Sequence, residues 1–144
     1  MVDYGIRYNE RAQLKIYNRI VASFFCLPED ERLVLLFILQ RTVGWGKAWK
    51  TISPQDFSTG VFRGDAGQRN VIIGGTGLAS DRVTQALRSL QGMGAVEAHE
   101  LGRQTIYRII EDWCHPELPT EGRYRIWSVH ESEYAYDEAA NQEE

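Results

Sequence analysis

Between positions 9 and 25, apolar residues recur at spacings of three and four. They are Leu14, Tyr17, Ile20, Val21 and Phe24. This spacing predicts an amphipathic helix from Asn9 to Phe25 that turns these side chains toward a core. Basic residues recur every four positions on the other side. They are Arg7, Arg11, Lys15 and Arg19. This second row is either a solvent-exposed face or a set of phosphate contacts.

A second helix is predicted from Pro28 to about Thr42. Proline is common in the first turn of a helix, and the acidic residues of positions 29–31 suit its positive dipole end. The run from Leu33 to Leu39 is apolar almost all round. Such a helix is buried on more than one side, either at the centre of a domain or partly in a dimer interface.

Glycines end this helix, and residues 43–53 carry Trp45 and Trp49, which we expect to pack in the core. A short strand-like pair at 51–52 follows. Ser53 and Pro54 then predict a short helix, with serine as N-cap and proline at the first helical position, ending near residue 60. Residues 63–77 are rich in glycine and have a strand-like patch at 71–73, which predicts a loop or small hairpin inserted before the next helix.

The stretch from Thr76 to Ile110 predicts a helix followed by a β-hairpin. The helix begins with Ser80 as N-cap and ends near Gly92 or Gly94. Strands at 95–100 and 104–110 are joined by residues 101–103. A helix followed by such a "wing" is the layout of a winged helix-turn-helix, in which the helix enters a DNA major groove. The predicted fold class is therefore α+β, mainly α, with an extra N-terminal helix.

The predicted recognition helix has one apolar and one polar arc. The apolar arc contains Val83, Ala86, Leu87 and Leu90, and the polar arc is centred on Asp81, Gln85 and Arg88, with Arg82, Thr84 and Ser89 on its flanks. Arginine pairs with guanine, glutamine with adenine, and aspartate accepts from cytosine. Ser80 and Thr84 are placed for phosphate oxygens. The other interpretation of this arc is an inert or protein-binding face.

Three further cations are candidates for DNA contacts. Arg103 lies at the predicted wing tip, and Lys47 and Lys50 precede the first short strand as a second backbone clamp. His99 and Arg108 lie on the wing strands. Among the histidines, His115 has no spaced partner that would suggest a metal, and no nucleophile–base pair is visible. We therefore expect no enzyme, no catalytic residues, no metal and no cofactor.

Composition places the chain among soluble proteins but leaves its partner open. The 144 residues have a net charge of −4. Up to position 115 there are 14 Lys and Arg against 12 Asp and Glu, and from position 116 there are 2 against 8. The acidity therefore belongs to the tail, and the body is mildly basic, which permits DNA binding. Two cysteines, Cys26 and Cys114, are too few for a disulfide framework or a zinc site and are expected to be buried thiols.

Three regions follow from these patterns. Residues 1–27 form the N-terminal helix, 28–113 the winged helix domain, and 114–144 an acidic, partly disordered tail in which 124–129 has the pattern of one more strand. No run is long enough to span a membrane, and the first residues lack the apolar core of a signal peptide, so the expected location is the cytoplasm.

Three motifs resemble the N-terminal DNA-binding domain of phage replication protein O. They are the helix exit R-T-x-G-W-x-K at 41–47, the I-S-x-x-x-F at 52–57, and the T-G-L-A-x-x-x-V-x-x-A-L-x-x-L of the recognition helix at 76–90. The resemblance covers about residues 27–110 and implies binding to repeated sites at a replication origin. That family recruits a helicase or its loader through a separate C-terminal region, whereas this chain has only a short acidic tail after the wing.

The sequence thus supports two hypotheses of function. The first is sequence-specific binding of double-stranded DNA, in phage or plasmid replication initiation or in transcription regulation, where a homodimer or repeated sites would extend the contact surface. The second is a small phage-type winged-helix protein that inhibits or adapts a host nucleic-acid machine through protein contacts. Its support is the acidic tail, with aromatic residues between positions 124 and 136, as a surface for a protein partner.

Overall fold

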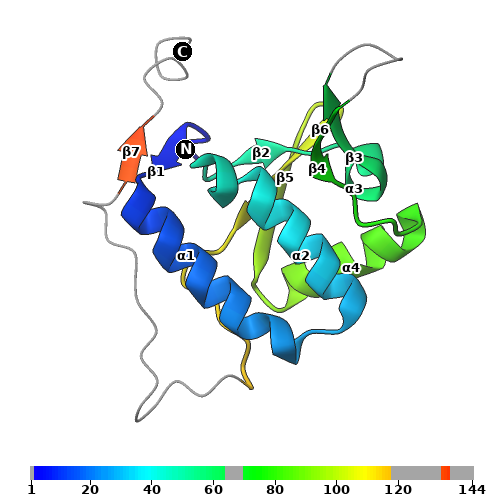
Figure 1. The fold of residues 1–144 in the computed structure, drawn as a ribbon, viewed down its shortest axis with the longest axis horizontal. Coiled ribbons are helices and arrows are strands. Elements are labelled where there is room, and N and C mark those ends of the chain that lie inside the picture. Colours follow the sequence, from blue (N-terminus) through cyan, green and yellow to red (C-terminus); the bar gives the residue numbers. More distant parts are fainter. Residues whose placement is uncertain (1, 64–69, 118–133, 137–144) are drawn as a thin grey trace.

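A computed structural model describes residues 2–63, 70–117 and 134–136 of the chain (Figure 1). The helices are α1 (Glu10–Ser23), η1 (Phe24–Cys26), α2 (Glu29–Arg41), η2 (Val43–Trp45), α3 (Pro54–Thr59) and α4 (Ser80–Gly92), of which η1 and η2 are single 3₁₀ turns. The strands are β1 (Ile6–Tyr8), β2 (Lys50–Thr51), β3 (Gly60–Arg63), β4 (Asn70–Gly74), β5 (Val96–Leu101), β6 (Gln104–Ile109) and β7 (Tyr134–Tyr136). The expected α+β class is confirmed.

A three-stranded antiparallel sheet of order β2-β6-β5 forms the β part of the main core. In the β5–β6 hairpin, Ala98 lies opposite Tyr107 and His99 opposite Ile106. Because side chains alternate between the two faces of a strand, Tyr107 and Ile106 point to opposite sides of the sheet. The ring of Tyr107 meets Phe57 of α3 edge-on, with centroids 5.4 Å apart, so this face packs on the helices.

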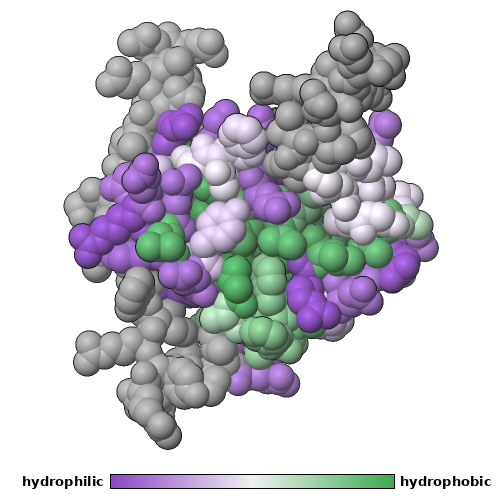
Figure 2. Space-filling model, in the orientation of Figure 1, coloured by the Kyte–Doolittle hydropathy of each residue, from purple (hydrophilic) through white to green (hydrophobic). Residues whose placement is uncertain are grey.

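The second helix lies at the centre of the fold, as its apolar sequence predicts. Five of its side chains are buried: Val34, Leu35, Phe37, Ile38 and Leu39. Phe37 packs against Phe57 with ring centroids 5.3 Å apart, which joins α2 to α3. Leu33 and Leu36 are only half-buried. Figure 2 shows apolar residues gathered on the face of the molecule along which α2 runs in Figure 1.

The first helix exists as predicted, and its buried face agrees with the predicted one in part. The side chain of Asn9 caps it by accepting a hydrogen bond from the Ala12 amide at 2.9 Å. The buried residues are Ala12, Ile16, Arg19, Ile20 and Ser23. Leu14 and Val21, which the spacing assigned to the core, are 58% and 41% exposed. Ile20 is buried, and the half-buried Tyr17 and Phe24 pack against the core, as the spacing predicts.

Arg19 does not belong to a solvent-exposed or phosphate-binding row, contrary to one of the predictions. Its side chain is only 3% exposed. Nη1 donates to the backbone oxygen of Glu111 at 2.6 Å and to Asp112 at 3.2 Å. The arginine therefore ties α1 to the segment that follows β6, and its aliphatic stem adds to the core.

Two further predictions of burial were wrong in part. Trp49 is buried at 4% exposure, as expected, but Trp45 is 51% exposed in the turn after α2. The cysteines Cys26 and Cys114 are both free thiols and are half-buried rather than fully buried. One cluster of buried side chains includes residues of α1, α2, α4 and the β5–β6 hairpin, so the N-terminal helix shares its core with the region that follows.

The glycine-rich insertion is an antiparallel hairpin, β3–β4, which confirms the predicted loop or small hairpin. Gly60 faces Gly74 at its base. Just beyond it, Thr76 donates from both its amide and its hydroxyl to the backbone oxygen of Phe57, at 2.8 and 2.7 Å. A Cβ on Gly75 would lie 2.5 Å from backbone atoms of residues 58–60. The hairpin base is thus closed tightly against the end of α3.

A second small sheet joins the two ends of the described chain and is absent from the sequence prediction. β1 pairs antiparallel with β7, with Ile6 opposite Tyr136 and Tyr8 opposite Tyr134. Figure 1 shows this pair beside the start of α1. Residues 134–136 are therefore ordered within a tail that was expected to be partly disordered. The strand predicted at 124–129 lies outside the described residues.

Candidate functional site

The helix α4 presents a broad polar face. Its buried residues Val83, Ala86 and Leu90, with half-buried Leu87, match the predicted core arc. The exposed residues are Ser80, Asp81, Arg82, Thr84, Gln85, Arg88 and Gln91. Ser80 is not the N-cap as predicted. Ala79 holds that position and makes no side-chain cap, while Ser80 is the first helical residue and its backbone oxygen accepts from the Thr84 hydroxyl at 2.9 Å.

Two polar contacts fix α4 against the acidic start of α2. Arg82 donates from Nε and Nη2 to the two carboxylate oxygens of Asp30, at 2.9 and 2.6 Å. Ser89 donates to the carboxylate of Glu31. Hydrogen bonding to Asp30 raises the pKa of Arg82 further above its usual range. Arg82, a predicted DNA contact, is therefore already paired and acts first to orient α4.

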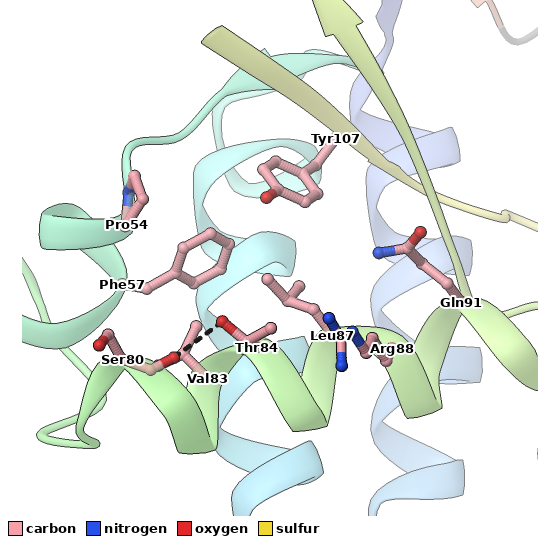
Figure 3. Close-up of a pocket in the computed structure, with 9 residues that line it drawn as sticks. All are labelled: Pro54, Phe57, Ser80, Val83, Thr84, Leu87, Arg88, Gln91 and Tyr107. Carbon is pink, nitrogen blue, oxygen red and sulfur yellow. Dashed lines mark hydrogen bonds between the residues drawn. The ribbon is translucent and has the colours of Figure 1, made fainter. Parts of the chain in front are cut away.

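A pocket of about 360 Å³ opens beside the polar face of α4 (Figure 3). Its apolar wall consists of Pro54, Phe57, Val83, Leu87 and Tyr107. Its polar residues are Ser80, Thr84, Arg88 and Gln91, all from α4. Burial raises the pKa of Tyr107. The structure thus brings three predicted contact residues, Ser80, Thr84 and Arg88, to the edge of one concave surface.

A group of cations lies near the end of α2. Burial, followed by repulsion from Lys47 and Arg41, lowers the pKa of Lys50. Lys47 and Lys50 line a second pocket, of about 230 Å³, together with Arg7. Within residues 2–63, 70–117 and 134–136, no carboxylate forms an ion pair with Arg41, Lys47 or Lys50. We call these three residues the cationic cluster. Its uncompensated charge favours an anion.

The remaining predicted residues lie on different parts of the β5–β6 hairpin, which is the predicted wing. Arg103 is exposed at the β5–β6 turn, where Gly102 has a positive φ of 65°. His99 accepts from or donates to the Tyr4 hydroxyl through Nδ1 at 2.9 Å, and its ring lies 5.0 Å from that of Trp49. Arg108 stacks over Trp49 at 5.3 Å. His99 and Arg108 therefore stabilise packing on the sheet face away from α4, and Arg103 is the wing cation left exposed among the described residues of the hairpin.

Two residues beside the predicted contact residues were not predicted from the sequence. Arg41 joins the cationic cluster, and Gln91 joins the pocket beside α4. Gln91 lies seven positions after Thr84 and three after Arg88, so helical periodicity places it on the same face of α4 as those two residues. Arg41 lies at the end of an apolar helix, and only the fold brings it near Lys50. In the described part of the chain, Asp81, Gln85, Arg88 and Arg103 make no side-chain hydrogen bond or ion pair.

Comparisons of the chain with protein-family models, with curated proteins and with solved structures gave no match. Among the described helices, none is both long and apolar enough to cross a lipid bilayer.

Proposed function

We propose that this chain is a winged helix-turn-helix protein that binds double-stranded DNA, with α4 in the major groove. The order of elements supports this fold: helix α2, strand β2, helices α3 and α4, and the hairpin β5–β6. The strand order β2-β6-β5 is the one that such a protein needs to place the hairpin beside its third helix. The hairpin β3–β4 is then an insertion between the two helices of the helix-turn-helix.

The exposed arc of α4 is the observation that carries the proposal. Gln85 and Arg88 are exposed, and neither has a partner in the part of the chain that the structure describes. Both side chains form paired hydrogen bonds with purine edges in the major groove. Thr84 and Ser80, about one and two turns before Arg88, are placed for phosphate oxygens, and Ser80 lies at the positive end of the helix dipole.

Cations outside α4 supply the contacts to the DNA backbone. Arg103 at the wing tip reaches the flanking backbone or minor groove, and the cationic cluster contributes a second point of attachment. Since Lys50 is held among like charges, a phosphate would relieve repulsion as well as form new contacts. A cluster of this kind contributes affinity for any sequence and does not select bases.

The biological setting follows from the resemblance to the phage replication protein O domain. We propose a cytoplasmic role in phage or plasmid replication initiation or in transcription regulation. Repeated sites or a homodimer would bring two copies of α4 to the DNA, because one module of this size buries a limited surface.

Selection of bound duplexes from a random pool tests the proposal. Wild type should enrich a defined motif, and Arg88→Ala should lose preference at one position of it, at a cost of about 1–3 kcal/mol for the preferred base. Arg103→Ala should weaken binding to all sequences about equally and reduce the salt dependence. Failure of the wild type to bind any duplex at low salt would exclude the proposal.

A second candidate function rests on the sheet formed by β1 and β7. Arg7 of β1 lies opposite Ala135 of β7 on one side and Lys47 on the other. The acidic residues after position 136 therefore follow directly on a strand beside cationic residues. This favours a protein that inhibits or adapts a nucleic-acid machine of the host, with the acidic stretch as its partner surface.

Truncation after Tyr136, which keeps β7, tests whether the acidic stretch competes with DNA or recruits a protein partner. If residues 137–144 compete with DNA for the cationic residues, DNA affinity should rise on truncation, most strongly at low salt. If they recruit a protein, DNA affinity should stay unchanged while capture of that protein from host extract is lost.

A further inference from the structure

The chain brings three metal-ligating groups together at the end of α1. A ligand atom of Cys26, one of His115 and one of Glu117 all lie within 4.8 Å of one another. Cys26 ends η1, whereas the other two residues follow β6. No pattern in the sequence connects them, because the cysteine is far from the histidine along the chain. The juxtaposition is produced by the fold.

Contacts on both sides hold this arrangement in place. The amide of His115 donates to the hydroxyl of Ser23 at 3.0 Å, and Ser23 is fully buried at the end of α1. Trp113 is 8% exposed and donates from its indole to the backbone oxygen of Met93 at 3.1 Å. Its ring meets that of His115 edge-on, with centroids 6.3 Å apart. The histidine is thus fixed beside η1 by the main core.

We propose that Cys26, His115 and Glu117 bind one zinc ion. Thiolate, imidazole and carboxylate are the three ligand types that Zn²⁺ takes in proteins, and hard cations such as Mg²⁺ and Ca²⁺ select oxygen ligands instead. Three protein ligands leave the fourth tetrahedral position to water. Bound zinc links the segment after β6 to the end of α1.

The geometry needs only a small adjustment. Zinc bonds of about 2.0–2.3 Å place tetrahedral ligand atoms about 3.5 Å apart, so separations of up to 4.8 Å among the three atoms must shorten by at most about 1.3 Å. Glu117 is exposed and its side chain is free to make that movement. The imidazole Nδ1 now accepts a hydrogen bond from the Glu117 amide at 3.1 Å, so a metal bound through Nδ1 replaces that bond. Binding also releases the thiol proton of Cys26.

Cobalt spectroscopy on the full chain, freed of metal with a chelator, tests the site. Co²⁺ should give visible ligand-field bands of a tetrahedral ion and a near-ultraviolet sulfur-to-cobalt charge-transfer band at one ion per chain. Zn²⁺ should then displace it. Cys26→Ser should abolish the charge-transfer band, and His115→Gln should weaken Zn²⁺ binding by more than about tenfold, since loss of outer-shell partners alone costs about 10- to 100-fold.

Cys114→Ser is the matched control, because Cys114 is also half-buried but lies outside the three-residue cluster. It should keep the band and the zinc affinity. The site is excluded if wild type shows no sulfur-to-cobalt band, or if Cys114→Ser removes it and Cys26→Ser does not. If Cys26→Ser loses its helical circular dichroism, Glu117→Gln replaces it as the test variant, because Glu117 is exposed. Its zinc affinity is measured by displacement of Co²⁺ with Zn²⁺. Unchanged affinity overturns the assignment, and a loss of more than about tenfold supports it.

Discussion

Arg82 and Asp30 form a two-pronged ion pair between α4 and the start of α2, with N–O distances of 2.9 and 2.6 Å. The side chains are 54% and 30% exposed, so water screens the pair and its contribution to stability is modest. Its geometric effect is larger. The planar guanidinium fixes how the Arg82 side chain lies against the start of α2, while the buried arc of Val83, Ala86 and Leu90 sets the rotation of α4.

A double-mutant cycle on this pair should give a small, salt-dependent coupling. Arg82→Ala and Asp30→Ala should each lower the free energy of unfolding only slightly, with a small favourable coupling that shrinks at high salt. Urea unfolding of the two single variants and the double variant measures it. A coupling of zero would show that the pair does not hold the helices together.

Removal of Lys47 and Lys50 together should reduce the salt dependence of DNA binding. Each lost phosphate contact lowers the slope of log K against log salt by about 0.9, so the double alanine variant should lose about 2 units. Arg32→Ala, at the other end of α2 from Arg41, is the control and should keep the wild-type slope. Fluorescence titrations at several salt concentrations provide the slopes, and an unchanged slope in the double variant would remove the cationic cluster from the interface.

Tyr8 should make the protein lose stability at alkaline pH. Its hydroxyl donates to Glu111 at 2.8 Å and accepts from Arg108 at 3.1 Å, and burial raises its pKa far above the usual value of about 10. Above about pH 10 the unfolded chain loses the phenol proton while the folded chain keeps it. The free energy of unfolding therefore falls by up to about 1.4 kcal/mol per pH unit. Below about pH 10 this contribution is fully present.

Tyr8→Phe should therefore show a shallower alkaline decline than wild type, although it is less stable by about 1–2 kcal/mol at neutral pH through the lost hydrogen bonds. Urea unfolding between about pH 8 and 11 measures both effects. Lys50, whose pKa is lowered, shifts stability in the opposite sense, so the difference between the two proteins is the informative quantity. Parallel declines would mean that Tyr8 does not carry the effect.

Gly75→Ala should destabilise the protein much more than Gly74→Ala. A Cβ at position 75 would lie 2.5 Å from the Gly60 nitrogen and the Ser58 oxygen, whereas position 74 has no atom within 4 Å. Relief of such a clash requires a backbone shift, at a cost of about 1–3 kcal/mol. Thermal unfolding compares the two variants, and equal melting temperatures would contradict the tight closure of the hairpin base.

Local signals in the sequence predicted the parts of the fold that depend on local chemistry. Ser53 caps α3 through a bond from the Asp56 amide at 3.1 Å, as the Ser-Pro pair indicates. The apolar arc of α4 was also predicted, because that helix packs on one side only. The buried face of α1 was predicted only in part. Ile20, Tyr17 and Phe24 pack in or against the core as expected, whereas Leu14 and Val21 remain exposed and Arg19 enters the core.

Contacts between distant segments left no such signal. The pairing of β1 with β7 joins three-residue strands, too short to show an alternating pattern. The approach of Cys26 to His115 depends on where the chain leaves β6, and Arg41 reaches Lys50 only because α2 ends beside β2. Each of these contacts arises from the packing of the whole chain.

The base of the β3–β4 hairpin is a suitable point at which to insert a foreign sequence. The backbone departs at Gly60 and returns opposite it at Gly74, with Thr76 fastened to Phe57 immediately afterwards. A guest sequence placed beyond this base would begin and end at neighbouring points, so it would not stretch the α3–α4 connection.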